Sequence, residues 1–162
     1  DRPLVVMDTA PAAVLGALED PQVGTQQEAI VANVGNMHTL AFQLHGTGST
    51  HTIGGLFEHH TGFLSRNKLE SLLAQLAAGT LSHDELFAEH GHGALVLGTA
   101  SVPLDFVAVT GPRGGLLVGS ELHPYLAVPY GDMMMAGCWG LVRACAQVLP
   151  WSAEPIETAL AR

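Results

Sequence analysis

The alternation of apolar and polar positions divides the first third of the chain into strands. The run Glu28–Val34 is apolar almost throughout, which predicts a strand buried on both faces. In Thr39–His45 apolar residues alternate with others, which predicts a strand with one apolar face. A third strand is expected at Ser49–Ile53, and Gly35-Asn36 supplies a tight turn after the first. The pattern therefore predicts a three-stranded antiparallel meander.

The middle of the chain shows helical periodicity instead. Ser65 can cap a helix that Gly79 ends, because serine accepts hydrogen bonds from free amides and glycine adopts the left-handed conformation at helix ends. The apolar stripe of this helix consists of Leu69, Leu72, Leu73 and Leu76. Ser82 and Glu85 form a capping box, which predicts a second, short helix.

Short elements complete the predicted order. Strands are expected at Leu4–Met7, Phe106–Val109 and Leu126–Val128, helices at Ala12–Leu18 and at Met133–Val148 between Asp132 and Pro150, and a chain break at Gly91-His92-Gly93. Strands followed by helices and by single strands between glycine-rich loops are typical of an α/β domain. We therefore expect a mixed sheet that carries the meander and is flanked by helices.

Composition supports one folded domain over residues 1–162. Hydrophobic residues make up 48% of the chain and charged residues 13%, whereas disordered chains are poor in the former and rich in the latter. The formal net charge is -9 and the six basic residues are scattered, so nucleic acid is not an expected partner.

Neither a membrane span nor a signal peptide is visible, which favours the cytoplasm. Because the first residue is Asp1, we expect that sequence upstream of it is missing.

Two glycine-rich segments follow predicted strands and are candidates for ligand binding. In Asn33–Thr39 a glycine turn exposes backbone N–H groups, and such turns can hold phosphate oxygens, although an ordinary hairpin uses the same residues. In Val107–Gly115 a strand runs into several glycines, which allow a flat ligand to approach the backbone closely. A plain surface loop is the alternative for this second segment.

Small residues gather in two of the predicted helices. The first contains Ala12, Ala13 and Gly16, and the second contains Ala136, Gly137 and Gly140. Each glycine costs a helix about 1 kcal/mol relative to alanine, so its presence indicates a need for close helix contact. This contact has two interpretations: it serves ordinary core packing, or it has a mechanical role.

In order, these elements resemble the C-terminal lobe of the actin-like ATPase superfamily, whose lobes have a ribonuclease-H-like fold. The resemblance implies two connecting helices, at Pro11–Gly16 and Ala136–Gly140, and a partner N-terminal lobe that is missing here. It also implies ATP with magnesium, bound by lobe closure that drives phosphoryl transfer or a switch in a partner protein. The isolated lobe would then be inactive.

The same resemblance implies roles for individual residues. Phosphates would meet Asn33, Gly35, Asn36, His38 and Thr39, the nucleoside would lie against Gly111, Gly114 and Gly115, and Asp8 would orient a magnesium-bound water. The superfamily's second phosphate loop usually begins with aspartate, which helps to hold the magnesium ion. Here Asn33 takes that place, and a neutral amide cannot supply the same charge to a hard cation. Hydrolysis is therefore in doubt, and a non-catalytic scaffold lobe is an alternative.

Three strings resemble a narrower group. Val31–Phe42, Phe57–Gly62 and Gly91–Ala94 are similar to an uncharacterised prokaryotic family whose members are often labelled "putative pyruvate formate-lyase activating enzyme". A radical activase of that kind needs three clustered cysteines for its iron–sulfur cluster. This chain has two, Cys138 and Cys145, which are expected to be buried thiols. Activase chemistry is therefore not supported by these residues.

Histidines supply an alternative of another class. The chain has nine, and the densest groups are Glu58-His59-His60 and His90-Gly91-His92. Imidazole and carboxylate groups suit zinc or iron, so His60, His90 and His92 could share an ion if the two groups converge. Polar contacts within the fold, with the missing lobe or with a substrate are the other interpretations, and histidine can also act as an acid or base.

Overall fold

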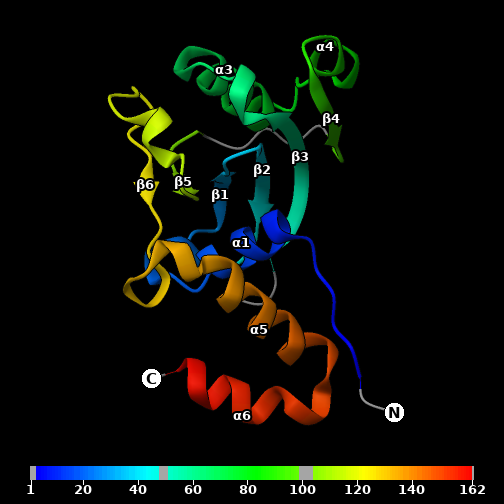
Figure 1. Ribbon diagram of the computed structural model, residues 1–162, viewed down its shortest axis with the longest axis vertical. Coiled ribbons are helices and arrows are strands. Elements are labelled where there is room, and N and C mark those ends of the chain that lie inside the picture. Colours follow the sequence, from blue (N-terminus) through cyan, green and yellow to red (C-terminus); the bar gives the residue numbers. More distant parts are fainter. Residues whose placement is uncertain (1–2, 48–50, 99–103, 162) are drawn as a thin grey trace.

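Six strands form one mixed sheet in the computed structural model, which describes residues 3–47, 51–98 and 104–161 (Figure 1). The strands are β1 (Glu28–Val34), β2 (His38–His45), β3 (Thr52–His60), β4 (Gly91–Val96), β5 (Val107–Thr110) and β6 (Tyr125–Leu126), in the spatial order β4-β3-β2-β1-β5-β6. From β1 to β4 neighbouring strands are antiparallel, whereas β5 runs parallel to β1 and β6 parallel to β5. The predicted α/β class and the antiparallel meander are confirmed, and the meander has a fourth strand, β4, beyond the three that the sequence predicts.

Helices cover both faces of the sheet. They are α1 (Thr9–Ala17), α2 (Pro21–Gly24), α3 (Arg66–Ala78), α4 (His83–Ala88), α5 (Ala136–Val148) and α6 (Pro150–Leu160). Single 3-10 turns lie at η2 (Thr61–Phe63), η3 (Gly114–Leu117), η4 (Pro129–Gly131) and η5 (Met133–Met135). One core forms between α3 and the sheet, and the other between α1 and the opposite face. This explains the unbroken apolar run of β1, because its alternate residues enter the two different cores.

The helix α3 begins and ends where the sequence predicts. The Ser65 hydroxyl accepts a hydrogen bond from the Lys68 amide at 3.2 Å, and Gly79 ends the helix with φ of +68°. All four leucines of the predicted stripe are buried against the sheet. Ser82 caps α4 in the same way, by accepting from the Glu85 amide at 3.3 Å.

Close backbone contact joins α1 to α5. A Cβ atom added to Gly16 would lie 1.7 Å from the carbonyl oxygen of Ala136, and one added to Gly140 would lie 1.8 Å from that of Ala12. The predicted need for small residues is therefore confirmed at these two positions. The Arg143 guanidinium on α5 also donates to both carboxylate oxygens of Glu19, at 2.6 and 2.9 Å, which ties α5 to the end of α1.

Several predicted elements differ from the observed ones. Leu4–Met7 forms no strand, since the sheet offers it no partner among the described residues. Part of the strand expected at Ser49–Ile53 lies outside the described residues. The observed β3 continues through Gly54-Gly55 to His60, because β2 pairs with it as far as His60 and β4 pairs with it from Gly55 to His59.

The chain does not break at the glycines around His92. Gly91–Val96 is the strand β4, and Gly93 lies at an irregularity in its pairing with β3 with φ of +147°, a conformation that favours glycine. Pro150 ends α5 as predicted but also begins α6, because proline is well suited to the first helical turn. Of the two expected buried thiols, Cys138 is exposed and Cys145 is half-buried.

Candidate ligand site at the sheet edge

The two glycine-rich segments lie next to each other. Because β1 and β5 are adjacent and parallel, both end at the same edge of the sheet, where Asn33 is paired in register with Thr110. The loop after β5 then folds over the end of β1, and the Arg113 amide donates to the carbonyl oxygen of Val34 at 2.9 Å. In open α/β sheets, ligands commonly bind beyond the carboxyl ends of the strands. The sheet edge that holds residues 33–37 and 110–115 is called the edge site below.

Glycine is required where these loops meet. Gly111 has φ of +97°, and a Cβ atom there would lie 2.6 Å from both the Asn33 Oδ1 atom and the Val34 carbonyl oxygen. A Cβ atom on Gly35 would lie 2.6 Å from the carbonyl oxygen of His38. Gly115 is exposed, and a Cβ atom there would meet nothing within 4 Å. The glycines at 35 and 111 thus serve the packing of the edge site, while the one at 115 leaves open space in front of the backbone.

The other residues predicted to contact phosphate differ in their exposure and in the direction of their side chains. Asn33 is half-buried and Asn36 is exposed in the turn between β1 and β2. The Thr39 hydroxyl is buried and hydrogen-bonded to that of Thr61 at 2.9 Å, so this side chain is directed into the fold. The His38 ring extends from the turn toward β3, where its Nδ1 atom lies 3.2 Å from the Glu58 carboxylate.

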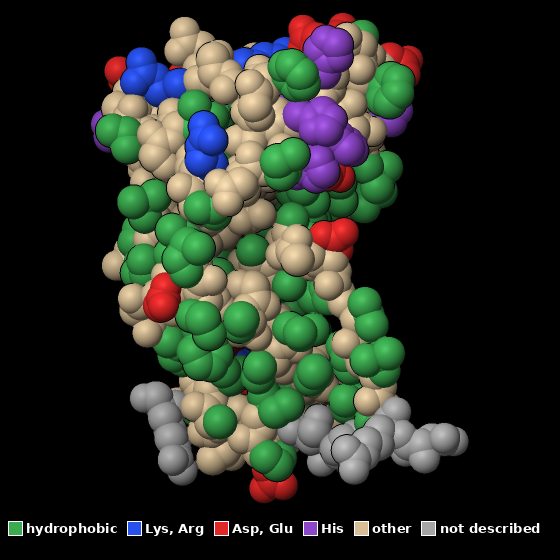
Figure 2. All heavy atoms as spheres, in the orientation of Figure 1, with side chains coloured by type: hydrophobic (Ala, Val, Ile, Leu, Met, Phe, Trp, Pro, Cys, Tyr) green, Lys and Arg blue, Asp and Glu red, His purple; other side chains and the backbone are tan. Residues whose placement is uncertain are grey.

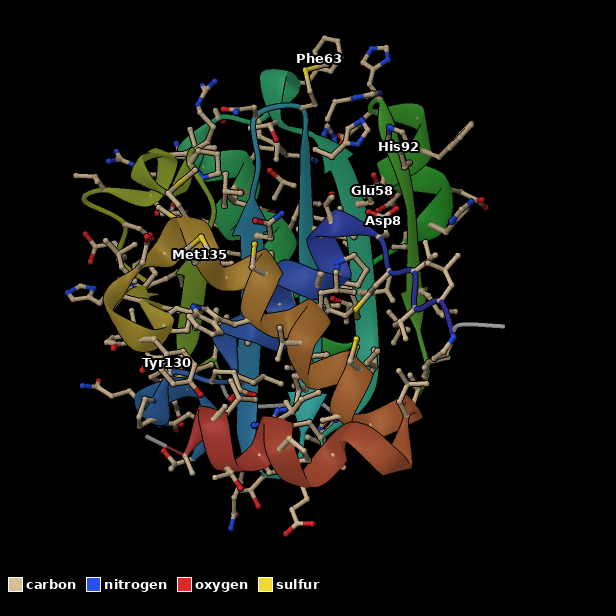
Figure 3. The ribbon with its side chains drawn as sticks, turned by 60° about the horizontal axis from the view of Figure 1, so that its bottom comes forward. Asp8, Glu58, Phe63, His92, Tyr130 and Met135 are labelled. Atoms are coloured by element: carbon tan, nitrogen blue, oxygen red, sulfur yellow. The ribbon has the colours of Figure 1, made fainter. Side chains whose placement is uncertain are left out.

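Asp8 lies at the start of α1 and is exposed. Its carboxylate accepts a hydrogen bond from the Ala10 amide at 3.4 Å, which is the helix-capping geometry. In Figure 3, Asp8 lies on the same side of the molecule as Glu58 and His92. The structure therefore shows its capping role, and its role in magnesium binding stays a prediction.

Sequence reasoning missed two features of the edge site. The Thr110 hydroxyl is buried and has no hydrogen-bond partner within the part of the chain that the structure describes. Arg113 is exposed, and among the described basic side chains it alone makes neither an ion pair nor a hydrogen bond. A single threonine at the end of a strand, or a single arginine in a loop, cannot be recognised in the sequence as part of a binding site. Only the pairing of β1 with β5 brings these residues next to the turn after β1.

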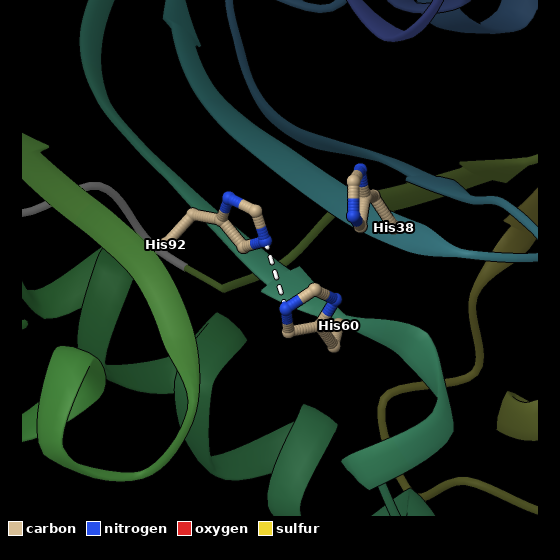
Figure 4. A group of neighbouring side chains, drawn as sticks. All are labelled: His38, His60 and His92. Atoms are coloured by element: carbon tan, nitrogen blue, oxygen red, sulfur yellow. Dashed lines mark hydrogen bonds between the residues drawn. The ribbon is translucent and has the colours of Figure 1, made fainter.

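Three histidines converge beside the edge site. His38, His60 and His92 come from the adjacent strands β2, β3 and β4, and one ring nitrogen of each lies within 4.8 Å of the others (Figure 4). The Nε2 atoms of His60 and His92 are 3.0 Å apart. This set is called the histidine group below. Figure 2 shows histidine side chains gathered at one end of the visible face.

Crowding of these rings affects protonation. Desolvation, followed by the neighbouring His92 and His38, lowers the pKa of His60 below its usual value. Glu58 acts in the opposite direction on His60 but more weakly. Neutral imidazole is the form that binds a metal ion, so the environment of His60 favours the ligating form.

The sequence prediction of a histidine site needs one correction. His60 and His92 do come together, but His38 takes the third place that was expected for His90. His90 adopts a left-handed backbone with φ of +69°, and its ring lies 5.0 Å from that of Phe63. The reason is positional, because His38 is directly paired with His60 across the β2–β3 ladder, whereas His90 precedes β4.

The chain belongs to the family described as "Putative pyruvate format-lyase activating enzyme (DUF1786)", whose model matches residues 1–116. This family match includes the edge site up to Gly115 and all members of the histidine group. No curated protein and no solved structure matched the chain. None of the described helices combines the length and the apolar composition that crossing a membrane requires.

Proposed function

We propose that this chain is a nucleotide-binding lobe that holds ATP with magnesium at the edge site. The observation that carries the proposal is the meeting of the Asn33–Gly35 turn with the Gly111–Gly115 loop at the carboxyl ends of β1 and β5. The turn between β1 and β2 would face the phosphates with its backbone N–H groups, apart from that of Gly35, which donates to the His38 carbonyl oxygen at 3.0 Å. Of the glycines in the second segment, the exposed Gly115 would border the nucleoside, whereas Gly111 and Gly114 are buried. Two loops from adjacent parallel strands can thus hold the two ends of one ligand.

Electrostatics at the edge site agree with an anionic ligand. Arg113 brings a positive charge that no described carboxylate neutralises, in a chain whose formal net charge is -9. An arginine is suited to phosphate because its planar guanidinium can donate two parallel hydrogen bonds. His38 would contribute through its backbone only, since its ring is directed to Glu58.

The arrangement of helices favours one lobe of an actin-like ATPase fold. In that fold two helices connect the lobes. The close crossing of α1 with α5 is suited to such a role, because direct backbone contact allows little movement of one helix relative to the other. Closure of a second lobe over the edge site would complete the nucleotide cleft. Catalysis of phosphoryl transfer depends mainly on positioning and charge stabilisation, so one lobe alone should be nearly inactive.

Asn33 favours binding over hydrolysis. Its amide stands where the superfamily's second phosphate loop carries a carboxylate, and a neutral ligand holds magnesium more weakly. Asp8 is the remaining acidic candidate for a magnesium-bound water, at the exposed start of α1. With asparagine in place of aspartate, the chain would bind ATP without hydrolysing it, and it would then act as a scaffold or as a switch.

Calorimetric titration with ATP and magnesium tests the proposal. The wild-type chain should bind one nucleotide, and Arg113→Ala should weaken binding about 10-fold, because a hydrogen bond to a charged group contributes about 1.5–3 kcal/mol. Lys68→Ala is the matched control, since it removes one positive charge that is already paired with Glu89 on the surface. Equal weakening by both variants, or no binding by the wild type in calorimetry and thermal-shift assays, would refute the edge site.

A further inference from the structure

The geometry points to a zinc site formed by His38, His60 and His92, which we propose as a second ligand site of this chain. Three imidazole nitrogens and one open position form a common zinc coordination in proteins. The three side chains come from β2, β3 and β4, so the site would sit on hydrogen-bonded strands and not on loops. The proposal is independent of nucleotide binding, because it uses different side chains.

Strand pairing accounts for the convergence. His38 and His60 are direct partners in the antiparallel β2–β3 ladder, and side chains of such partners extend from the same face of the sheet. An irregularity between Glu58 and His59 shifts the pairing of β3 with β4. The ring of His92 then meets that of His60, with centroids 4.3 Å apart.

The distances suit a small ion after modest adjustment of one side chain. At zinc–nitrogen bonds of about 2.0–2.1 Å, tetrahedral geometry places ligand nitrogens about 3.3 Å apart. The Nε2 atoms of His60 and His92, at 3.0 Å, already lie near this value. All separations in the group lie within 4.8 Å, so the His38 ring would have to approach the other two by up to about 1.5 Å to reach that spacing.

Glu58 provides a carboxylate partner for one of the three histidines, which is a further feature of metal-binding histidine sites. Its carboxylate lies 3.2 Å from Nδ1 of His38, so it can accept the Nδ1–H hydrogen bond and leave Nε2 unprotonated. Metal-bound histidines commonly donate their second N–H to a carboxylate in this way. The negative charge also offsets part of the charge of a divalent cation. Glu58 is therefore assigned as a positioning residue for the zinc ligand His38.

Space for an exogenous ligand lies beside the proposed ion. A cavity of about 440 Å³ is lined by His60, His92, His90, Gly91 and two exposed aromatic side chains, Phe63 and Phe87. Figure 3 shows Phe63 and His92 at the same end of the molecule. Two of the zinc ligands thus form part of the cavity wall, so the open coordination position can face the cavity. A small anionic or carbonyl ligand with an apolar body fits a zinc ion beside two phenyl rings.

Competition with a chromophoric chelator measures zinc affinity directly. The wild-type chain should bind one zinc ion, and His92→Ala should weaken binding at least 100-fold, because it removes one of three protein ligands. Glu58→Gln should weaken it about 10-fold or more, as loss of such outer partners does. His90→Ala is the matched control, since it removes a neighbouring histidine outside the group and should leave the affinity within about 2-fold.

Each outcome decides the proposal. His92 is exposed, so its replacement should leave the fold intact, which circular dichroism can verify for every variant. Binding that falls equally in the His90 and His92 variants would show adventitious surface binding and overturn the assignment. Absence of stoichiometric zinc binding by the wild type would overturn it as well. The titration contains no nucleotide, so either result leaves the edge-site proposal untouched.

Discussion

The close crossing of α1 and α5 makes a sharp prediction for Gly140→Ala. The added Cβ atom would lie 1.8 Å from the Ala12 carbonyl oxygen and 2.7 Å from the Gly16 amide nitrogen. Both obstacles are backbone atoms, so no side-chain rotation can relieve the contact and the helices must move apart. Overpacking of this kind costs about 1–3 kcal/mol, and a backbone clash belongs at the upper end.

Helix propensity acts in the opposite direction and sets the net value. Alanine stabilises a helix by about 1 kcal/mol relative to glycine, so Gly140→Ala should lower the free energy of unfolding by about 2 kcal/mol in total. Gly137→Ala is the matched control on the same helix, because its Cβ atom would come no closer than 4.0 Å to any neighbour. That variant should gain up to about 1 kcal/mol.

Urea unfolding followed by circular dichroism measures the difference between the two variants. The expected gap of about 3 kcal/mol corresponds to about 6–12 °C in melting temperature for a domain of this size. Equal stabilities of Gly137→Ala and Gly140→Ala would refute the close crossing, and with it the interpretation of α1 and α5 as a tightly coupled pair.

The remaining predictions concern the two ligand sites. Gly115→Val should weaken ATP binding at least 10-fold without loss of stability, whereas Gly62→Ala, at an equally open position, should change neither in calorimetry and thermal melting. Because the pKa of His60 is lowered in the folded chain, the unfolded chain binds more protons at mildly acidic pH; stability should therefore fall as pH drops below about 6.5. The fall in melting temperature between pH 7.5 and 5.5 should be smaller in His60→Gln, and an identical fall would contradict the pKa shift. Asn33→Asp should tighten magnesium-dependent ATP binding and raise any ATP hydrolysis measured in a phosphate-release assay; unchanged values in both would reject the carboxylate argument.

Much of the fold is readable in the sequence because local signals and burial agree. Ser65 and Gly79 mark the ends of α3, and the unbroken apolar run of β1 reflects cores on both faces of the sheet. The glycines at 16 and 140 indicate the helix crossing, since only close contact justifies their cost in a helix. These features depend on neighbours in sequence or on periodicity alone.

The parts that were missed depend on pairing between distant segments. Gly91 and Gly93 suggest a chain break, but the second of them serves an irregular strand pairing with β3. That pairing decides which histidines meet, and so His38 and not His90 joins His60. Likewise, the position of Arg113 beside Val34 follows from the parallel pairing of β1 with β5, which no local pattern reveals.

Backbone hydrogen exchange with and without ATP and magnesium tests the central claim most directly, namely that two separate glycine-bent loops share one ligand. Amides in residues 33–37 and in 110–115 should both exchange more slowly when nucleotide is present, while those of Arg66–Ala78 in α3 should be unaffected. Protection of only one loop, or protection confined to a region away from the ends of β1 and β5, would contradict the account.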